Sequence, residues 1–203
     1  SGIRRIARET TANDFRAKSR ILLDSSGFTL DPVSEAGEYH YGTFVDAAES
    51  YSISTYGKIF GISRKALIND DLGGLGDVTA RLGLAAAEFE REFLVNLLVA
   101  NAGLGPVMSD TRKLFDEAHG NIGTDGAPSE TTLSGARLLM RKQTGPGGGL
   151  ISVVPRYLVC PSELETSCEK LIASVQATAT ADVNTFDFLE LIVEPRLKDP
   201  KRW

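Results

Sequence analysis

The feature that most constrains the fold is a long alanine-rich segment, from Asp77 to about Ala102, with an apolar residue at every third or fourth position. This spacing places the apolar residues on one face of a helix. The stripe consists of Val78, Leu82, Ala85, Phe89, Phe93, Leu97 and Ala100. Glycines precede and follow the segment and set its ends. About 26 residues, each rising 1.5 Å, predict a rod about 39 Å long. Because the stripe is wide and aromatic, we expect it to pack on a sheet rather than in a coiled coil.

The segment 28–60 has an extended pattern, in which aromatic and β-branched residues alternate with glycines and acids. From Tyr51 the alternation predicts a strand that runs into a short helix and stops at Asn69–Asp71. Few large aliphatic residues occur, so a hairpin formed here buries little core of its own. We therefore expect it to project and to contact another chain. Aromatic residues suit such contacts, and the candidates are Tyr39, Tyr41, Phe44 and Tyr51.

The C-terminal half mixes helices and strands, which predicts an α+β fold. Residues 128–143 have a helical pattern, and the glycines of 145–149 then interrupt the chain. Residues 150–160 and 186–193 predict strands. Between them, a capping box of Ser162 and Glu165 predicts the start of a third helix. That helix would carry Leu164, Cys168, Leu171, Ile172 and Val175.

The first twenty residues contain six basic residues and only two acidic ones. Two interpretations stay open for this segment. It is either a solvated, partly helical arm or an arm that lies on an acidic neighbouring subunit. In the second case the contact residues would be Arg4, Arg5 and Arg8.

Composition excludes several classes of protein. The net charge of −5 argues against a general nucleic-acid binder, which is usually basic. No apolar run reaches the roughly 18 residues of a membrane span, and the N-terminal residues have no apolar signal region. Cys160 and Cys168 lack a metal-binding spacing, so we expect two buried thiols, which suits a cytosolic origin.

The candidate catalytic residues do not form a recognisable site. Asp70 and Asp71 are adjacent, and adjacent residues generally point in different directions, so we interpret them as capping acids before the long helix. The sequence has no G-x-S-x-G motif that would provide a nucleophile for His119, so we expect His119 to be a loop residue that is hydrogen-bonded to the backbone. The glycines at 145–149 lack the Gly-Lys-Ser/Thr of a phosphate loop, which favours a flexible connection. We therefore expect no enzyme, no cofactor and no metal site.

Several segments, in their order along the chain, resemble the major head subunit of Mu-like prophages and related tailed phages. They are Val33–Glu38, Tyr56–Lys65, Ile68–Leu72, the alanine-rich helix, Leu114–Phe115 with His119–Asn121, and Leu150–Pro161 before a helix. Together they extend from about Phe28 to Trp203. The family normally continues beyond a position like Trp203, so we expect the chain to be truncated at its C-terminus.

The resemblance implies the Hong Kong-type capsid fold, which tailed phages share with herpesviruses and encapsulins. Residues 1–32 would be an N-terminal arm and 33–60 the extended E-loop. Residues 61–105 would be the peripheral domain with its spine helix, and 106–203 a mixed α/β axial domain. The spine helix residues would be Val78, Leu82, Phe89, Phe93 and Leu97.

The resemblance also implies a function. The chain would assemble with itself into the hexamers and pentamers of an icosahedral shell, built in the bacterial host cytoplasm and enclosing phage DNA non-specifically. Scaffold, protease and portal proteins would take part, and no membrane would. Two alternatives stay open: an encapsulin-like nanocompartment shell, and a small hydrolase using Asp70, Asp71 or His119.

Overall fold

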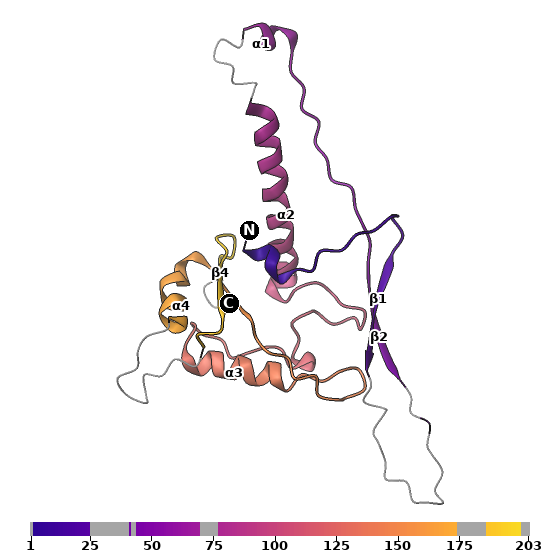
Figure 1. Ribbon diagram of the computed structural model, residues 1–203, viewed down its shortest axis with the longest axis vertical. Helices are drawn as coiled ribbons and strands as arrows, with labels where there is room; N and C mark the ends of the chain where they lie inside the picture. The colour runs from indigo at the N-terminus through magenta and orange to yellow at the C-terminus, as the bar shows by residue number, and fades with distance from the viewer. Residues whose placement is uncertain (1, 25–40, 42–43, 70–76, 174–185, 200–203) are drawn as a thin grey trace, which may run out of the picture.

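A computed structural model describes residues 2–24, 41, 44–69, 77–173 and 186–199 (Figure 1). Its longest element is α2, Val78–Gly103, which begins after Asp77 as the sequence predicts. Near its C-terminal end the backbone leaves helical geometry, and Asn101 and Ala102 have positive φ angles of 52° and 59°. The Asn101 side-chain amide donates a hydrogen bond of 2.8 Å to the Gly105 carbonyl, which supports the bend.

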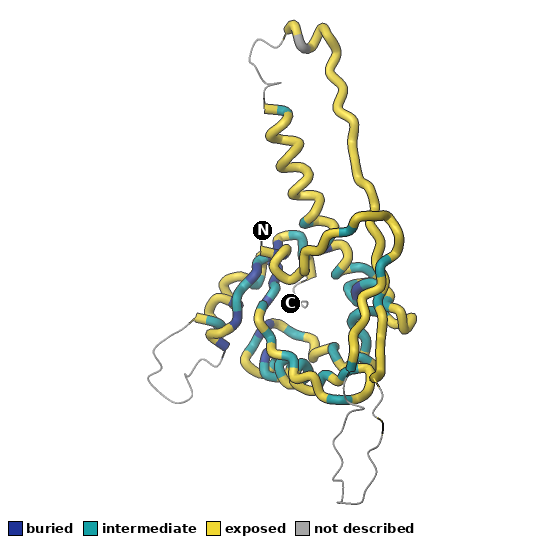
Figure 2. The backbone as a smooth tube through the Cα atoms, turned by 45° about the vertical axis from the view of Figure 1, so that its right-hand side comes forward, coloured by how far each residue is buried: buried dark blue, intermediate teal, exposed yellow. Residues whose placement is uncertain are grey.

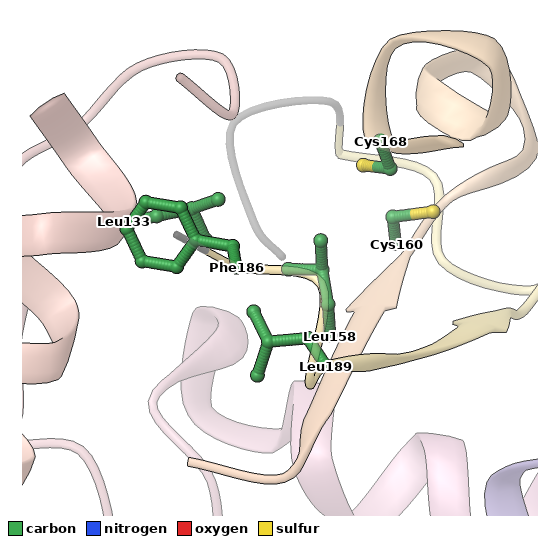
Figure 3. Packing of buried hydrophobic residues seen from close by; sticks show 6 residues of the cluster. All are labelled: Leu133, Leu158, Cys160, Cys168, Phe186 and Leu189. Atoms are coloured by element: carbon green, nitrogen blue, oxygen red, sulfur yellow. The ribbon is translucent and has the colours of Figure 1, made fainter. Parts of the chain in front are cut away.

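The body of the molecule consists of two short strands and two helices. Strand β3, Tyr157–Cys160, pairs in parallel with β4, Glu190–Val193. Helix α3, Glu130–Arg141, begins at a capping box in which Ser129 and Thr132 exchange hydrogen bonds. Helix α4, Glu165–Ile172, contacts both strands. One buried cluster joins these elements (Figure 3), formed by Leu133, Leu158, Cys160, Cys168, Phe186 and Leu189.

Three predictions for this half were wrong in detail. Strand β3 begins only at Tyr157, because Pro155 has no N–H for a ladder and Ser152 has a φ of 45°. A 3-10 helix, η4 (Ser162–Leu164), precedes α4, so Leu164 caps α4 and the expected capping box is not formed. The second strand likewise starts late, after a turn from Phe186 to Leu189. Val175, expected in the third helix, lies outside the described residues.

The hairpin is built from an earlier part of the chain than expected. Strand β1, Lys18–Asp24, pairs antiparallel with β2, Val45–Tyr51, so the first strand lies within the segment interpreted as an arm. The expected strand over 51–60 is not formed, since residues 52–63 have no regular secondary structure and run beside α2 (Figure 1). The short helix is confirmed as α1, Arg64–Ile68, capped by the Ser63 hydroxyl.

The N-terminal residues pack on the body rather than extending into solvent. They form a 3-10 helix, η1 (Ile3–Ile6), which contacts α2. Ile3 is only 1% exposed. Gly2 lies so close to Ile192 that a Cβ there would be 2.9 Å from its side chain. Within this segment only Ile3 is buried, so the interpretation of a solvated, partly helical arm was wrong for Ile3, and the four other residues are exposed.

Candidate functional site

Many of the exposed large apolar side chains lie on the elements that leave the body. Figure 2 shows β1, β2, residues 52–63 and most of α2 exposed. On β1 the side chains of Ile21, Leu22 and Leu23 are 60%, 56% and 65% exposed. Large contiguous apolar surfaces of this kind mark sites of protein–protein contact.

The two faces of the hairpin differ. Residues opposite one another in an antiparallel pair share a face, so Ile21, Leu23 and Ala48 lie on one side. Arg20, Leu22, Asp24 and Glu49 lie on the other. Glu49 and Asp24 both hydrogen-bond to loops of the body. The side that carries Ile21 and Leu23 therefore faces away from those loops.

The aromatic residues predicted for this region are exposed where the structure describes them. Tyr41 is fully exposed, Phe44 is 61% exposed and Tyr51 is 39% exposed. Tyr39 lies outside the described residues. Tyr51 is opposite Lys18 at one end of the ribbon, and Phe44 immediately precedes β2. Their part in subunit contacts stays a prediction.

The stripe of α2 is also largely open to solvent. Leu82, Phe89, Phe93 and Leu97 are between 42% and 48% exposed, Val78 is half-buried, and only Val95 of this helix is buried. Instead of a sheet, the Tyr56 ring covers part of the stripe, 4.9 Å from Phe89 and 5.8 Å from Phe93 between ring centroids. The expected packing on a sheet was therefore wrong for the described residues.

Two of the predicted arginine contacts are made within the chain. Arg4 lies 3.2 Å from the Glu90 carboxylate on α2. Arg5 pairs with Glu190 on β4 and stacks over the Tyr157 ring at 5.2 Å. Arg8 is exposed. The N-terminal segment thus contacts α2 of its own chain, whereas the β1–β2 hairpin lies on another side of the molecule (Figure 1).

A polar cluster surrounds His119, which ends the 3-10 helix η3, Glu117–His119. Its Nδ1 lies 3.2 Å from the Leu114 carbonyl, as a loop residue bonded to backbone should, and its Nε2 lies 2.8 Å from Asp110 Oδ2. The hydrogen bond to Asp110 and then the Leu114 carbonyl raise the pKa of His119 above 6.5. The same contact lowers the pKa of Asp110. The hydrogen bond from the Ala118 N–H lowers the pKa of Asp116. The sequence pointed to His119 but not to Asp110, which is nine residues away.

The two cysteines are buried thiols, as expected. Burial raises the pKa of Cys160, and it raises that of Cys168 to about 12. Such thiols stay protonated and unreactive at neutral pH.

The remaining candidates form no catalytic or metal centre where they can be placed. Asp70 and Asp71 lie outside the described residues. The described part of the chain contains no group of three or more His, Cys, Asp or Glu that could hold a metal ion. No helix within it combines the length and hydropathy of a membrane span. The glycine segment forms a turn, in which Gly145 donates to the Gly149 carbonyl, and Gly147 donates to Asp24 on β1.

Comparison with known proteins identifies the family. Residues 47–203 match the family model described as phage capsid protein. This match covers well over half of the chain, and the chain belongs to the phage capsid protein family. The resemblance to a tailed-phage head subunit drawn from the sequence is thereby confirmed, and the family points to a structural protein.

A solved structure has a similar fold. It is described as the capsid of bacteriophage JBD30 decorated with minor capsid protein trimers. The alignment has a TM-score of 0.56 and 15% sequence identity, and it covers 88% of this chain and 84% of that chain. The α+β class predicted from the sequence agrees with this likeness. Among curated proteins no match was found.

Proposed function

We propose that this chain is the major head subunit of a tailed phage, which assembles with itself into an icosahedral shell around DNA. In this proposal the fold is of the Hong Kong type. The β1–β2 hairpin is the base of the E-loop, α2 is the spine helix, and the body belongs to the axial domain of hexamers and pentamers. Scaffold, protease and portal proteins would act during assembly in the host cytoplasm, and the finished protein would reside in the virion.

Apolar side chains that stay exposed on the described extended elements carry this proposal. On β1, Ile21, Leu22 and Leu23 are at least 56% exposed, and on α2 Phe89 and Phe93 are 42% and 45% exposed. A subunit that covers these side chains with several neighbours at once explains why the isolated chain leaves them open to solvent.

The distribution of apolar side chains supports the same conclusion. Nine hydrophobic residues are buried in the described chain, against 28 large ones that are exposed. The exposed ones lie on elements that point in different directions, notably β1, residues 52–63 and α2 (Figure 2). Surfaces that differ in position and direction form heterologous contacts, which generate rings and closed shells.

The acidic net charge shapes the proposed relation to DNA. With a charge of −5, the chain has no general electrostatic attraction for phosphates. We therefore propose that the shell encloses DNA without tight or sequence-specific binding by this subunit.

Assembly is tested by sedimentation velocity and negative-stain electron microscopy of the chain over a range of concentrations. We expect capsomers or shells, with assembly favoured by higher salt because apolar contacts dominate. A monomer that stays monodisperse at every concentration and salt would contradict the proposal. The encapsulin-like alternative is separated by the neighbouring genes: portal and terminase genes indicate a phage head, and a cargo enzyme indicates a nanocompartment.

A further inference from the structure

The base of the hairpin is held to the body by a ring of polar contacts, which we call the hairpin clasp. Its members are Glu49, Ser109, Asp110, His119, Gln143, Gly147 and Asp24. Figure 1 shows the loops after α2 and after α3 reaching the hairpin. The contacts run from β2 through two loops of the body and back to β1, and His119 is the one histidine among them.

The first half of the clasp connects β2 to His119. Ser109 donates its N–H to both Glu49 carboxylate oxygens, at 3.1 Å and 3.2 Å, and its hydroxyl to Oε1 at 2.6 Å. The next residue, Asp110, accepts the Arg112 N–H at 3.0 Å and faces His119 Nε2 at 2.8 Å. The turn that carries both residues is therefore fixed from the hairpin on one side and from His119 on the other.

The second half returns from His119 to β1. The Gln143 side-chain amide donates to the carbonyls of His119 and Gly120, at 3.1 Å and 3.0 Å. The turn that follows Gln143 presents the Gly147 N–H to Asp24 Oδ2 at 2.8 Å. Asp24 also approaches Gly145 so closely that a Cβ there would lie 2.4 Å from its carboxylate.

Glu49 and Asp24 are anchors at separate points of the ribbon. Glu49 is opposite Arg20 in the register, and Asp24 is four residues further along β1. At about 3.3 Å per residue, the anchors are about 13 Å apart along the strand. Two anchors at this spacing fix both the position and the direction of the hairpin.

We propose that the hairpin clasp is a pH-sensitive mount, closed while His119 is an imidazolium ion and loosened when that ion loses its proton. Both ring nitrogens of His119 face groups that can only accept a hydrogen bond, the Asp110 carboxylate and the Leu114 carbonyl. Neutral imidazole carries one N–H, so one of its nitrogens would then direct a lone pair at an acceptor. The cation satisfies both contacts.

The surrounding charges favour the cation. Asp110 faces His119 from the 106–113 turn, and Asp116 lies before η3, with Glu117 on η3 itself. Arg112 is the basic residue in this group, and it is directed at Asp116, 3.3 Å away. From the end of α3 the contacting group is the neutral amide of Gln143. The carboxylates thus outnumber the single arginine around the ring.

The turn at Ser109 is also held in an unfavourable conformation. Thr111 has a φ of 68°, which a β-branched residue rarely adopts. When the contact between Asp110 and His119 weakens, the turn can relax, and Ser109 loses its alignment with Glu49. In this way the protonation state of His119 affects the contact between Ser109 and Glu49 on the hairpin.

The direction of the pH effect follows from the raised pKa of His119. A group whose pKa is higher in the closed state stabilises that state below its open-state pKa, near 6.5, and the contribution is lost as the pH rises through the closed-state value. Asp110 and Asp116 act at the acidic end of the pH range. Because their pKa values are lowered in the closed state, their contribution to its stability is lost as the pH falls below about 3.8. The clasp is therefore tightest in mildly acidic solution and loosens toward alkaline pH.

The test measures the proton and the clasp separately on the dispersed full chain. The His40→Gln change leaves His119 as the single histidine, so NMR can follow its titration alone. Hydrogen exchange, corrected for intrinsic rates, reports opening at the amides of Ser109 and Gly147. Linkage ties the two measurements together. Between about pH 5.5 and about pH 9, the protection of these amides should fall by a factor of 10 to the power n, where n is the difference between the His119 pKa in the closed state and in the open state. Each unit of elevation gives about a tenfold loss.

Three variants separate the parts of the proposal. His119→Gln should show low protection of Ser109 with no pH dependence. Glu49→Ala should free the hairpin and, because linkage is reciprocal, bring the pKa of His119 closer to its open-state value. Asp46→Ala, opposite Leu23 on the outward face, is the matched control and should behave like the parent chain. Far-UV circular dichroism checks that each variant stays folded.

Three results would overturn the proposal. If His119 titrates at or below 6.5, the cation is not favoured. If it titrates above 6.5 but protection at Ser109 and Gly147 does not follow it, the histidine does not control the mount. A fall in protection of equal size in the His119→Gln variant would also contradict it.

Discussion

The body and the extended half of this chain contain similar kinds of residues but use them differently. In the body, short elements such as β3, α3 and α4 gather six residues into one cluster, each at most 7% exposed. In α2, which is far longer than any of them, only Val95 is buried. The body therefore stabilises itself, whereas the extended half presents apolar surface that the isolated chain does not cover.

This contrast shows that helix length and apolar content do not decide where a core forms. Helix α2 is the longest helix of the described chain and has an apolar residue at every third or fourth position, yet its Phe89 and Phe93 rings stay 42% and 45% exposed beside Tyr56. The body has shorter helices, but its strands, helices and the turn at Phe186 converge from three separate parts of the sequence. Residues are therefore buried where several elements meet, and not simply where one helix is long.

The largest expected effect is the loss of Phe186 from the body. Its ring is 3% exposed and lies 4.8 Å below the Arg137 guanidinium. Phe186→Ala should lower the free energy of unfolding by about 3–5 kcal/mol, because it leaves a cavity in the cluster. Phe188→Ala is the matched control, since that ring is 44% exposed, and it should cost less than about 1 kcal/mol. Denaturant unfolding measures both, and equal losses would mean that the cluster is not the core.

A smaller effect is expected from the stripe of α2. Phe93 is 45% exposed, and its contacts include the rings of Phe89 and Tyr56. In the dispersed chain Phe93→Ala should therefore cost about 1 kcal/mol, of the order of an aromatic pair. The same measurement on Glu92→Ala provides the control on this helix. A loss as large as that of Phe186→Ala would show that α2 is already covered in the isolated chain and does not differ from the body in burial.

The smallest effect on folding is expected from the outward face of the hairpin. Replacing both Ile21 and Leu23 by serine should change the free energy of unfolding by less than about 1 kcal/mol, since each side chain is at least 60% exposed. If the ribbon contacts other subunits, the same variant should fail to form particles in electron microscopy. If the variant unfolds easily, these residues belong to the core. If it assembles normally, the outward face of the hairpin is not part of the subunit interface.

The sequence by itself determined the elements that depend on neighbouring residues. The period of α2, the glycines around it, the Ser129 start of α3 and the burial of both cysteines follow from local pattern and residue chemistry. The resemblance that led to the phage capsid family is also a property of the sequence. These features were predicted because they require no knowledge of distant contacts.

Tertiary structure decided which segments meet. Lys18–Asp24 became a strand because it pairs with Val45–Tyr51, a partner that its own residues do not specify. Residues 2–6 were expected to be an arm, but Ile3 is buried and its 3-10 helix contacts α2, which is far away in sequence. The clasp joins Glu49 to Ser109 and Asp24 to Gly147 across 60 and 123 positions. Side-chain periodicity reports only which way a residue points along its own element, so contacts at such separations arise only when the whole chain folds.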